Sequence, residues 1–176
     1  MSLPLVAALA VATADAPVTR LEFVTQESAW LDTLETRLHK SLKRPKETIL
    51  VYVDVPEPFR ARAVSLERDY RLYEGVDRFG YGTLDPNRAV TRRQATQLIL
   101  NLLSLVETLP TEPSAPLDFT DAPRDPFEVA RIEVLLQHGI LAGFPDKTLQ
   151  LDAPLSHTQF AALCDRMQHD LAEARP

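Results

Sequence analysis

The sequence predicts an all-α fold built from three similar units that share one core. The first observation is a pattern of the form S/T-x-x-E/Q, which recurs at similar intervals as Thr19-x-x-Glu22, Thr91-x-x-Gln94 and Ser156-x-x-Gln159. This pattern is typical of a helix start, because the hydroxyl accepts from a backbone N–H while the longer side chain reaches back. The second observation is that apolar residues at helical spacing follow each start. No unit could bury its own stripe, so the three stripes are expected to pack together.

The chain of 176 residues divides into three parts of unequal length and one linker. The order is a shortened first unit (1–47), a second unit (48–109), a Pro-rich linker (110–116) and a third unit (117–176). The linker is expected to be stiff, because each proline fixes its φ angle. The length suits a few small units with a common core, so we expect one compact domain.

The beginning of the chain permits two interpretations. The apolar run Leu3–Ala12 and the following Ala14-Asp-Ala16 fit a signal peptide, or they fit the first amphipathic helix of the first unit. The helix is favoured, because no Lys or Arg precedes the run. No apolar run approaches the ~18 residues that a membrane span needs.

Further elements follow from apolar spacing and from Gly and Pro punctuation. A β-branched run predicts a short extended segment near Ile49–Val53. Two helices are expected at Arg60–Tyr73 and Phe127–Gln137, and the capped helices are expected at Arg20–Leu38, Arg92–Leu109 and His157–Leu171. The capped helices should converge on the shared core, with Trp30 and Leu102 among the buried residues.

Composition argues against several classes of function. A net charge of −6 is unusual for a nucleic-acid-binding protein, so no nucleic-acid partner is expected. The four histidines lack zinc-ligand spacing, and Cys164 reads as a small core residue, so neither a metal nor a cofactor is predicted. No nucleophile elbow, P-loop or dinucleotide fingerprint is present, and the chain is predicted to be non-catalytic.

Ordered motifs in the units carry a family resemblance. The third unit contains Phe119-Thr-Asp-Ala-Pro123, Gly139-Ile-Leu-Ala-Gly-Phe-Pro-Asp-Lys-Thr-Leu149 and Leu155-Ser-His-Thr-Gln-Phe160. The second contains Tyr52-Val-Asp-Val-Pro56, Gly82-Thr-Leu-Asp-Pro86 and Val90-Thr-Arg-Arg-Gln94, and the first keeps Pro17-Val-Thr-Arg-Leu-Glu-Phe23. In this order they resemble the S-layer homology family, whose unit reads roughly F-x-D-V-P, helix, G-I-x-x-G-Y-P-D-G-T-F-x-P, I-T-R-A-E-F, helix. The resemblance covers nearly the whole chain.

The resemblance implies a three-unit helical domain with pseudo-threefold symmetry and grooves between the units. In the family those grooves bind acidic cell-wall polysaccharides, often pyruvylated, and so attach proteins to the cell envelope or cell surface. The family's ligand-contacting Arg carries over to Arg20 and Arg92, which are expected at groove edges. The remaining family positions carry over to Glu22, to the pair Gly139-Ile140 and, by position alone, to His157.

Departures from the family pattern leave a rival function open. His157 replaces the third motif Arg, and Gln94 and Gln159 replace the acidic residue. The Gly-Ile pair has only an approximate match at Gly75-Val76. Attachment through an acidic polysaccharide is therefore weighed against a protein–protein assembly module that keeps the fold without glycan binding, for which an intracellular location is open. For Arg20 and Arg92 themselves, the alternative to ligand contact is a solvated side chain or a salt bridge between units.

A basic cluster after the first capped helix offers one further contact for an anionic polymer. It consists of Lys40, Lys43, Arg44 and Lys46, and a solvated helix end is the simpler explanation for it.

Overall fold

The computed structural model describes residues 16–44, 52–77, 79 and 82–173. Its helices are α1 (Arg20–Leu38), α2 (Arg60–Arg68), α3 (Arg92–Leu103), α4 (Pro126–Gln137) and α5 (His157–Glu173). The part of the chain described contains no β-strand, and its only bridges are isolated ones. The predicted all-α class is therefore confirmed. The apolar run near the N-terminus and most of the predicted extended segment lie outside the described residues.

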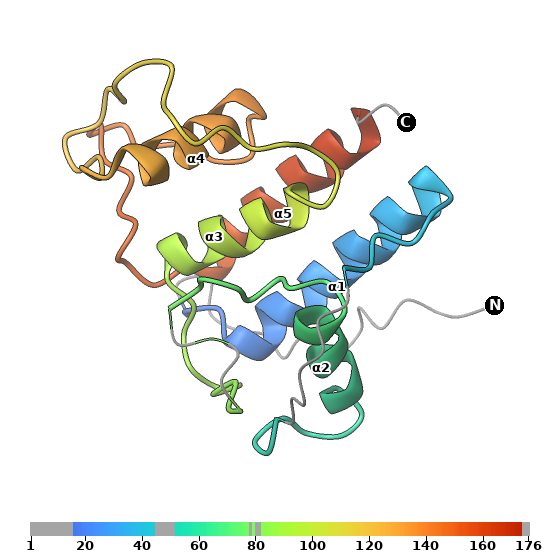
Figure 1. The fold of residues 1–176 in the computed structure, drawn as a ribbon. Helices are drawn as coiled ribbons and strands as arrows, with labels where there is room; N and C mark the ends of the chain where they lie inside the picture. Colours follow the sequence, from blue (N-terminus) through green and yellow to red (C-terminus); the bar gives the residue numbers. More distant parts are fainter. Residues whose placement is uncertain (1–15, 45–51, 78, 80–81, 174–176) are drawn as a thin grey trace.

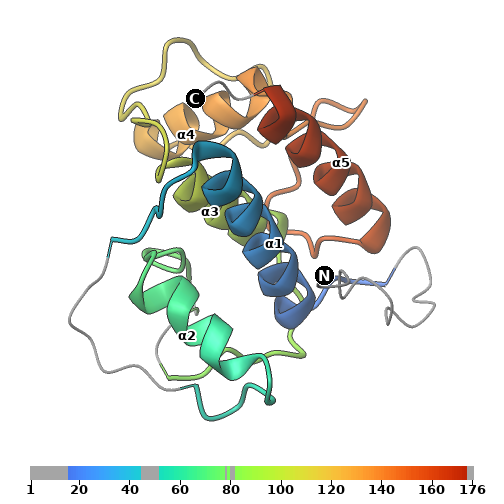
Figure 2. The same ribbon diagram turned by 90° about the vertical axis from the view of Figure 1, so that its right-hand side faces the viewer.

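Three helices form the centre of the molecule. Figures 1 and 2 show α1, α3 and α5 running near one another, with α2 beside α1 and α4 beside α3. Helix α1 packs against both α3 and α5. Helices α2 and α4 thus flank the central group on different sides.

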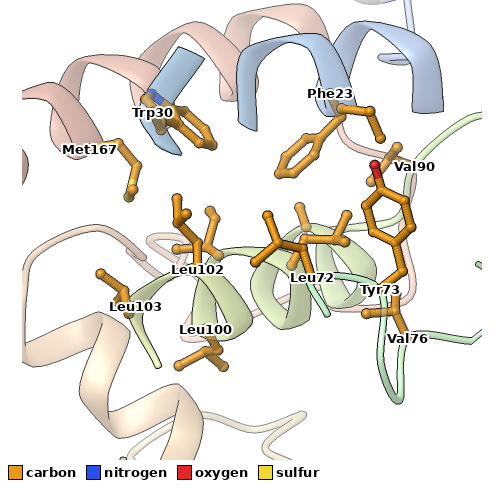
Figure 3. Packing of buried hydrophobic residues seen from close by; sticks show 14 of the residues in the cluster. Phe23, Trp30, Leu72, Tyr73, Val76, Val90, Leu100, Leu102, Leu103 and Met167 are labelled. Carbon is orange, nitrogen blue, oxygen red and sulfur yellow. The ribbon is translucent and has the colours of Figure 1, made fainter. Parts of the chain in front are cut away.

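One continuous apolar cluster fills the space between these helices. Figure 3 shows Trp30 of α1, Leu102 of α3 and Met167 of α5 pointing toward a common region. All three are buried, and Leu102 and Met167 have no exposed surface. The predicted core positions Trp30 and Leu102 are confirmed.

The capping boxes form as the sequence predicts. The Thr19 hydroxyl accepts from the Glu22 backbone N–H, and Glu22 accepts from the Thr19 backbone N–H at 2.8 Å. Thr91 and Gln94 make the same pair of bonds. In the third, the Ser156 hydroxyl accepts from the Gln159 N–H at 3.3 Å and the Gln159 side chain accepts in return at 3.2 Å. Each helix start therefore satisfies backbone donors that would otherwise lack partners.

Two predicted helices end earlier than expected. Helix α2 stops at Arg68 rather than Tyr73, because Arg71 adopts a left-handed φ of 61° and the Leu72 N–H bonds back to the Leu66 carbonyl. Helix α3 stops at Leu103 rather than Leu109, where the Ser104 hydroxyl donates to the Asn101 carbonyl at 2.7 Å. Local bonds outweigh apolar spacing at both ends.

The residues immediately before the three capped helices meet in a closed cycle of backbone hydrogen bonds. The Val18 N–H donates to the Leu155 carbonyl at 2.8 Å, Leu155 donates to Val90 at 2.8 Å, and Val90 donates to Val18 at 2.9 Å. All three side chains are buried. Because each segment gives one bond and receives one, the starts of α1, α3 and α5 are held at a single point of the molecule.

Candidate ligand-binding site

The predicted contact residue Arg20 lies in the protein interior. Its side chain has no exposed surface, whereas the sequence placed it at a groove edge. Nη1 donates to the Leu84 carbonyl at 2.9 Å, and the guanidinium lies 4.3 Å from the centre of the Phe79 ring. The half-exposed Asp85 carboxylate is 3.7 Å from Nη1. The groove-edge expectation is wrong for this residue, because the loop that precedes α3 covers it.

Arg92, the first residue of α3, has an environment closely similar to that of Arg20. It is 8% exposed, Nε donates to the Leu149 carbonyl at 2.8 Å, and the guanidinium lies 4.7 Å from the centre of the Phe144 ring. Nη2 also donates to the Ala142 carbonyl at 3.2 Å. Burial, reinforced by the positive charge of Arg166, lowers the pKa of the Arg92 guanidinium. Arg92 therefore also sits behind a loop rather than on a groove edge.

The loops that receive the two arginines have matching backbones. Asp85 and Gln150 both adopt a left-handed φ, 53° and 51°, as do Gly82 and Lys147. An aspartate from the F-x-D-x-P motif fixes each loop by accepting two successive backbone N–H bonds. Asp54 accepts from residues 84 and 85 at 2.9 and 2.6 Å, and Asp121 from residues 149 and 150 at 2.6 and 2.8 Å. Arg20 and Asp54 therefore hold the loop at Leu84 from two sides, and Arg92 and Asp121 hold the loop at Leu149 in the same way.

His157 is the first residue of α5, as Arg20 and Arg92 are of α1 and α3, and it contacts the start of α1. Its Nδ1 lies 2.8 Å from the Ala16 carbonyl oxygen and its Nε2 lies 3.2 Å from Glu22 Oε1. Burial lowers the pKa of His157, but the bonds to Ala16 and Glu22 outweigh it and the pKa is raised overall. Burial likewise opposes the net lowering of the Glu22 pKa, which comes from hydrogen bonds with Thr19 and His157. The structure thus brings Glu22 and His157 together where the starts of α1 and α5 meet.

The predicted Gly-Ile pair is a helix terminus. Gly139 adopts a φ of 69° just after α4, a conformation that favours glycine, and Ile140 is 1% exposed in the core. Gly75 and Val76 repeat this arrangement with a φ of 73° and a buried valine. None of the six predicted site residues lines either of the two hollows described next.

A hollow of about 370 Å³ does lie between α3, α4 and the segment after α2. Arg44, Arg71 and Arg131 line it, accompanied by a single acidic side chain, Glu74. Arg44 donates to the Ser104 carbonyl at 2.7 Å, and Arg71 pairs with Glu74 at 2.5 Å. Three guanidinium groups therefore surround one space on a chain whose net charge is −6. We call it the basic hollow.

A second hollow of about 290 Å³ adjoins the first. The two share Gln97, Phe127 and Arg131 as lining residues. Its charged lining residues beyond Arg131 are Arg93, Asp125 and Glu128, and Arg93 is ion-paired with Glu128. Leu100, Ile132 and Leu151 supply apolar walls. Since its charges are largely compensated, we call it the neutral hollow.

Sequence reasoning missed most of this candidate site. Arg44 belonged to the basic cluster after the first capped helix, so one signal was visible. Arg71 follows α2 and Arg131 lies in α4, and neither belongs to a recognised motif. Only tertiary packing places them beside Arg44. Phe127, 44% exposed, offered a second signal as a large aromatic near a helix start.

Other kinds of site find no support within the described residues. They contain no group of three or more His, Cys, Asp or Glu side chains placed to hold a metal ion. None of the helices described there is long and apolar enough to cross a membrane. Burial raises the pKa of the Cys164 thiol to about 12, which keeps it protonated and a poor nucleophile at neutral pH.

Comparison with known families gives one match. Residues 118–161 match the model of the S-layer homology domain, a stretch that includes α4, the Asp121-anchored loop and the start of α5. No curated protein matches the chain. S-layer homology domains are non-catalytic modules that associate with the cell envelope, and this part of the chain is similar to them. Phe127 and Arg131 of the two hollows lie inside the matched residues.

Proposed function

We propose that this chain attaches to the cell envelope by binding an acidic cell-wall polysaccharide in the basic hollow. The observation that carries the proposal is the convergence of Arg44, Arg71 and Arg131 on one space. A planar guanidinium binds a carboxylate through two parallel hydrogen bonds, which suits uronic or pyruvylated sugars. The match to the S-layer homology domain supports the envelope as the place where such a ligand is met.

Within this hollow Arg131 has the greatest capacity for an added partner. Its Nε is buried and has no hydrogen-bond partner among the residues that the structure describes. Burial lowers the pKa of its guanidinium, although arginine stays protonated at any physiological pH. A carboxylate in the hollow would supply the missing acceptor. We therefore assign Arg131 the main ligand contact and Arg44 and Arg71 supporting ones.

The motif arginines have a different role in this proposal. Arg20 and Arg92 tie the loops before α3 and α5 to the first turns of α1 and α3. Three such ties, with His157 as the third, also explain how the units form one domain, which we propose to be three S-layer homology-like units.

The test is co-sedimentation with purified bacterial cell walls that carry an acidic polymer. Wild type should pellet, and Arg131→Gln should weaken binding about tenfold, the scale of one charge-assisted hydrogen bond. Arg88→Gln is the matched control, because it removes the same charge from an exposed side chain outside both hollows. Attachment is contradicted if wild type stays soluble. Co-purification with a protein complex in that case would favour the assembly module.

A further inference from the structure

Phe127 and Arg131 form a ridge between the two hollows. They are four residues apart on α4 and therefore share one helix face. The Arg131 guanidinium lies 4.5 Å from the centre of the Phe127 ring, and the ring is 44% exposed. Both side chains line both hollows, so a ligand that passes from one hollow to the other must cross this pair.

An exposed ring at this place suits a sugar. The faces of a pyranose ring carry C–H groups, which pack on the flat face of an aromatic ring, and the hydroxyl groups at its edge remain free for hydrogen bonds. Gln97 lies beside the ridge, and its side-chain Oε1 is buried without a hydrogen-bond partner in the described part of the chain. Gln97 lines both hollows, so its side-chain amide lies beside a sugar bound in either one.

The two hollows differ in the charge they can accommodate. The basic hollow has three guanidinium groups against one carboxylate. In the neutral hollow Arg93 is held by Glu128 and by Asp152 at 2.9 Å, and the Asp125 carboxylate caps α4 by accepting from the Glu128 N–H at 3.3 Å. An added carboxylate there would meet two existing carboxylates and no free cation besides the shared Arg131. An uncharged sugar would meet apolar walls and polar edges.

We infer that the polysaccharide crosses the Phe127–Arg131 ridge, with an acidic sugar in the basic hollow and an uncharged sugar in the neutral hollow. The inference rests on the proposed function. It adds the path of the bound polysaccharide, from the basic hollow to the neutral hollow, and a minimum of two sugar units. Each hollow lies at the lower end of the volumes that hold small ligands, about 300–1,000 Å³, so each suits roughly one sugar unit. The recognised element is then an acidic sugar joined to a neutral one.

The experiment uses fragments of the acidic polymer from walls that pellet the wild type, separated by length after mild hydrolysis. Calorimetry should show that fragments holding an acidic and a neutral sugar bind wild type at least tenfold more tightly than the acidic sugar alone. Phe127→Ala should remove most of this gain. The single acidic sugar should weaken by a smaller factor, because the ring also lines the basic hollow and packs on Arg131. Phe127→Tyr keeps a flat ring and should restore the gain. Circular dichroism checks that each variant remains folded.

Charge variants separate the hollows. Arg71→Gln should weaken both fragments by a similar factor, because both place the acidic sugar in the basic hollow. Arg88→Gln, which lies outside both hollows, should change both by less than about threefold. The inference is overturned if the longer fragments bind no better than the single sugar, or if Phe127→Ala weakens both equally. Either result leaves wall attachment standing, whereas failure of wild type to pellet removes the proposed function and this inference together.

Discussion

The Arg20 guanidinium donates a hydrogen bond to the main-chain carbonyl of Leu84, 64 positions later in the chain, at 2.9 Å. Asp54 holds the N–H of the same residue at 2.9 Å, so Leu84 is fixed through both of its peptide groups. Arg92, Leu149 and Asp121 repeat this arrangement. A motif that elsewhere suggests ligand contact is here part of the structural frame.

Removing either buried arginine should therefore destabilise the fold. For Arg20→Ala or Arg92→Ala we expect a loss of about 2–4 kcal/mol, the scale of an unsatisfied buried carbonyl plus a desolvated cation–π contact. Urea unfolding followed by circular dichroism measures it. Arg88→Ala, an exposed control, should change the free energy of unfolding by less than about 0.5 kcal/mol. Equal effects of the three substitutions would contradict the structural role.

Leu102→Ala should remove a contact at the centre of the helix group. Leu102 has no exposed surface and points toward Trp30 and Met167 (Figure 3), so the expected cost is about 2–5 kcal/mol. Val106, 40% exposed, provides the matched control, and Val106→Ala should cost less than about 1 kcal/mol. A small effect at Leu102 would mean that the shared core lies elsewhere.

Glu27 is a buried carboxyl without a hydrogen-bond partner among the described residues. Burial, reinforced by the charge of Glu67, raises the pKa of Glu27 well above its usual value. A raised folded-state pKa favours folding at pH values below the unfolded pKa, and this contribution is lost as pH rises toward the folded pKa. Glu27→Gln should thus gain stability relative to wild type between about pH 5 and pH 8. A constant difference in the free energy of unfolding over this range would contradict a titrating Glu27.

His157 and Glu22 provide a second pH dependence, at the junction of α5 and α1. The raised His157 pKa contributes stability that is full below its unfolded pKa and is lost as pH rises through the folded value. The lowered Glu22 pKa contributes stability that disappears in acid. His157→Gln should therefore destabilise more at about pH 5.5 than at about pH 8.5. Unfolding curves at both pH values test this, and equal losses would show that the pair is not ionic.

Local chemistry explains which parts of the fold could be predicted. Thr19, Thr91 and Ser156 identify helix starts, because a cap and its partner three residues later lie within one turn. The end of α2 depends on the left-handed φ of Arg71, which apolar spacing does not encode. The three capped-helix segments are similar in sequence. Apolar spacing, however, does not reveal that loops cover Arg20 and Arg92.

The candidate site was harder to predict, because no local segment contains it. Arg44, Arg71 and Arg131 follow or belong to three different helices, and packing alone brings them to one hollow. Family motifs directed attention to Arg20 and Arg92, whose types suit an anion but whose burial only the fold reveals. The ridge residue Phe127 was visible as an aromatic, but its exposure was not.

The central claim is that ligand binds at the Phe127–Arg131 ridge rather than at the motif arginines. Titrating the isotope-labelled protein with soluble fragments of the acidic wall polymer, and recording amide and arginine side-chain NMR spectra, tests it most directly. Shifts should concentrate on residues 97–104 and 126–132 and on the Arg131 Nε–H signal, while residues 84–88 change little. Shifts centred on Arg20, Arg92 and residues 84–88, with Arg131 unaffected, would contradict it.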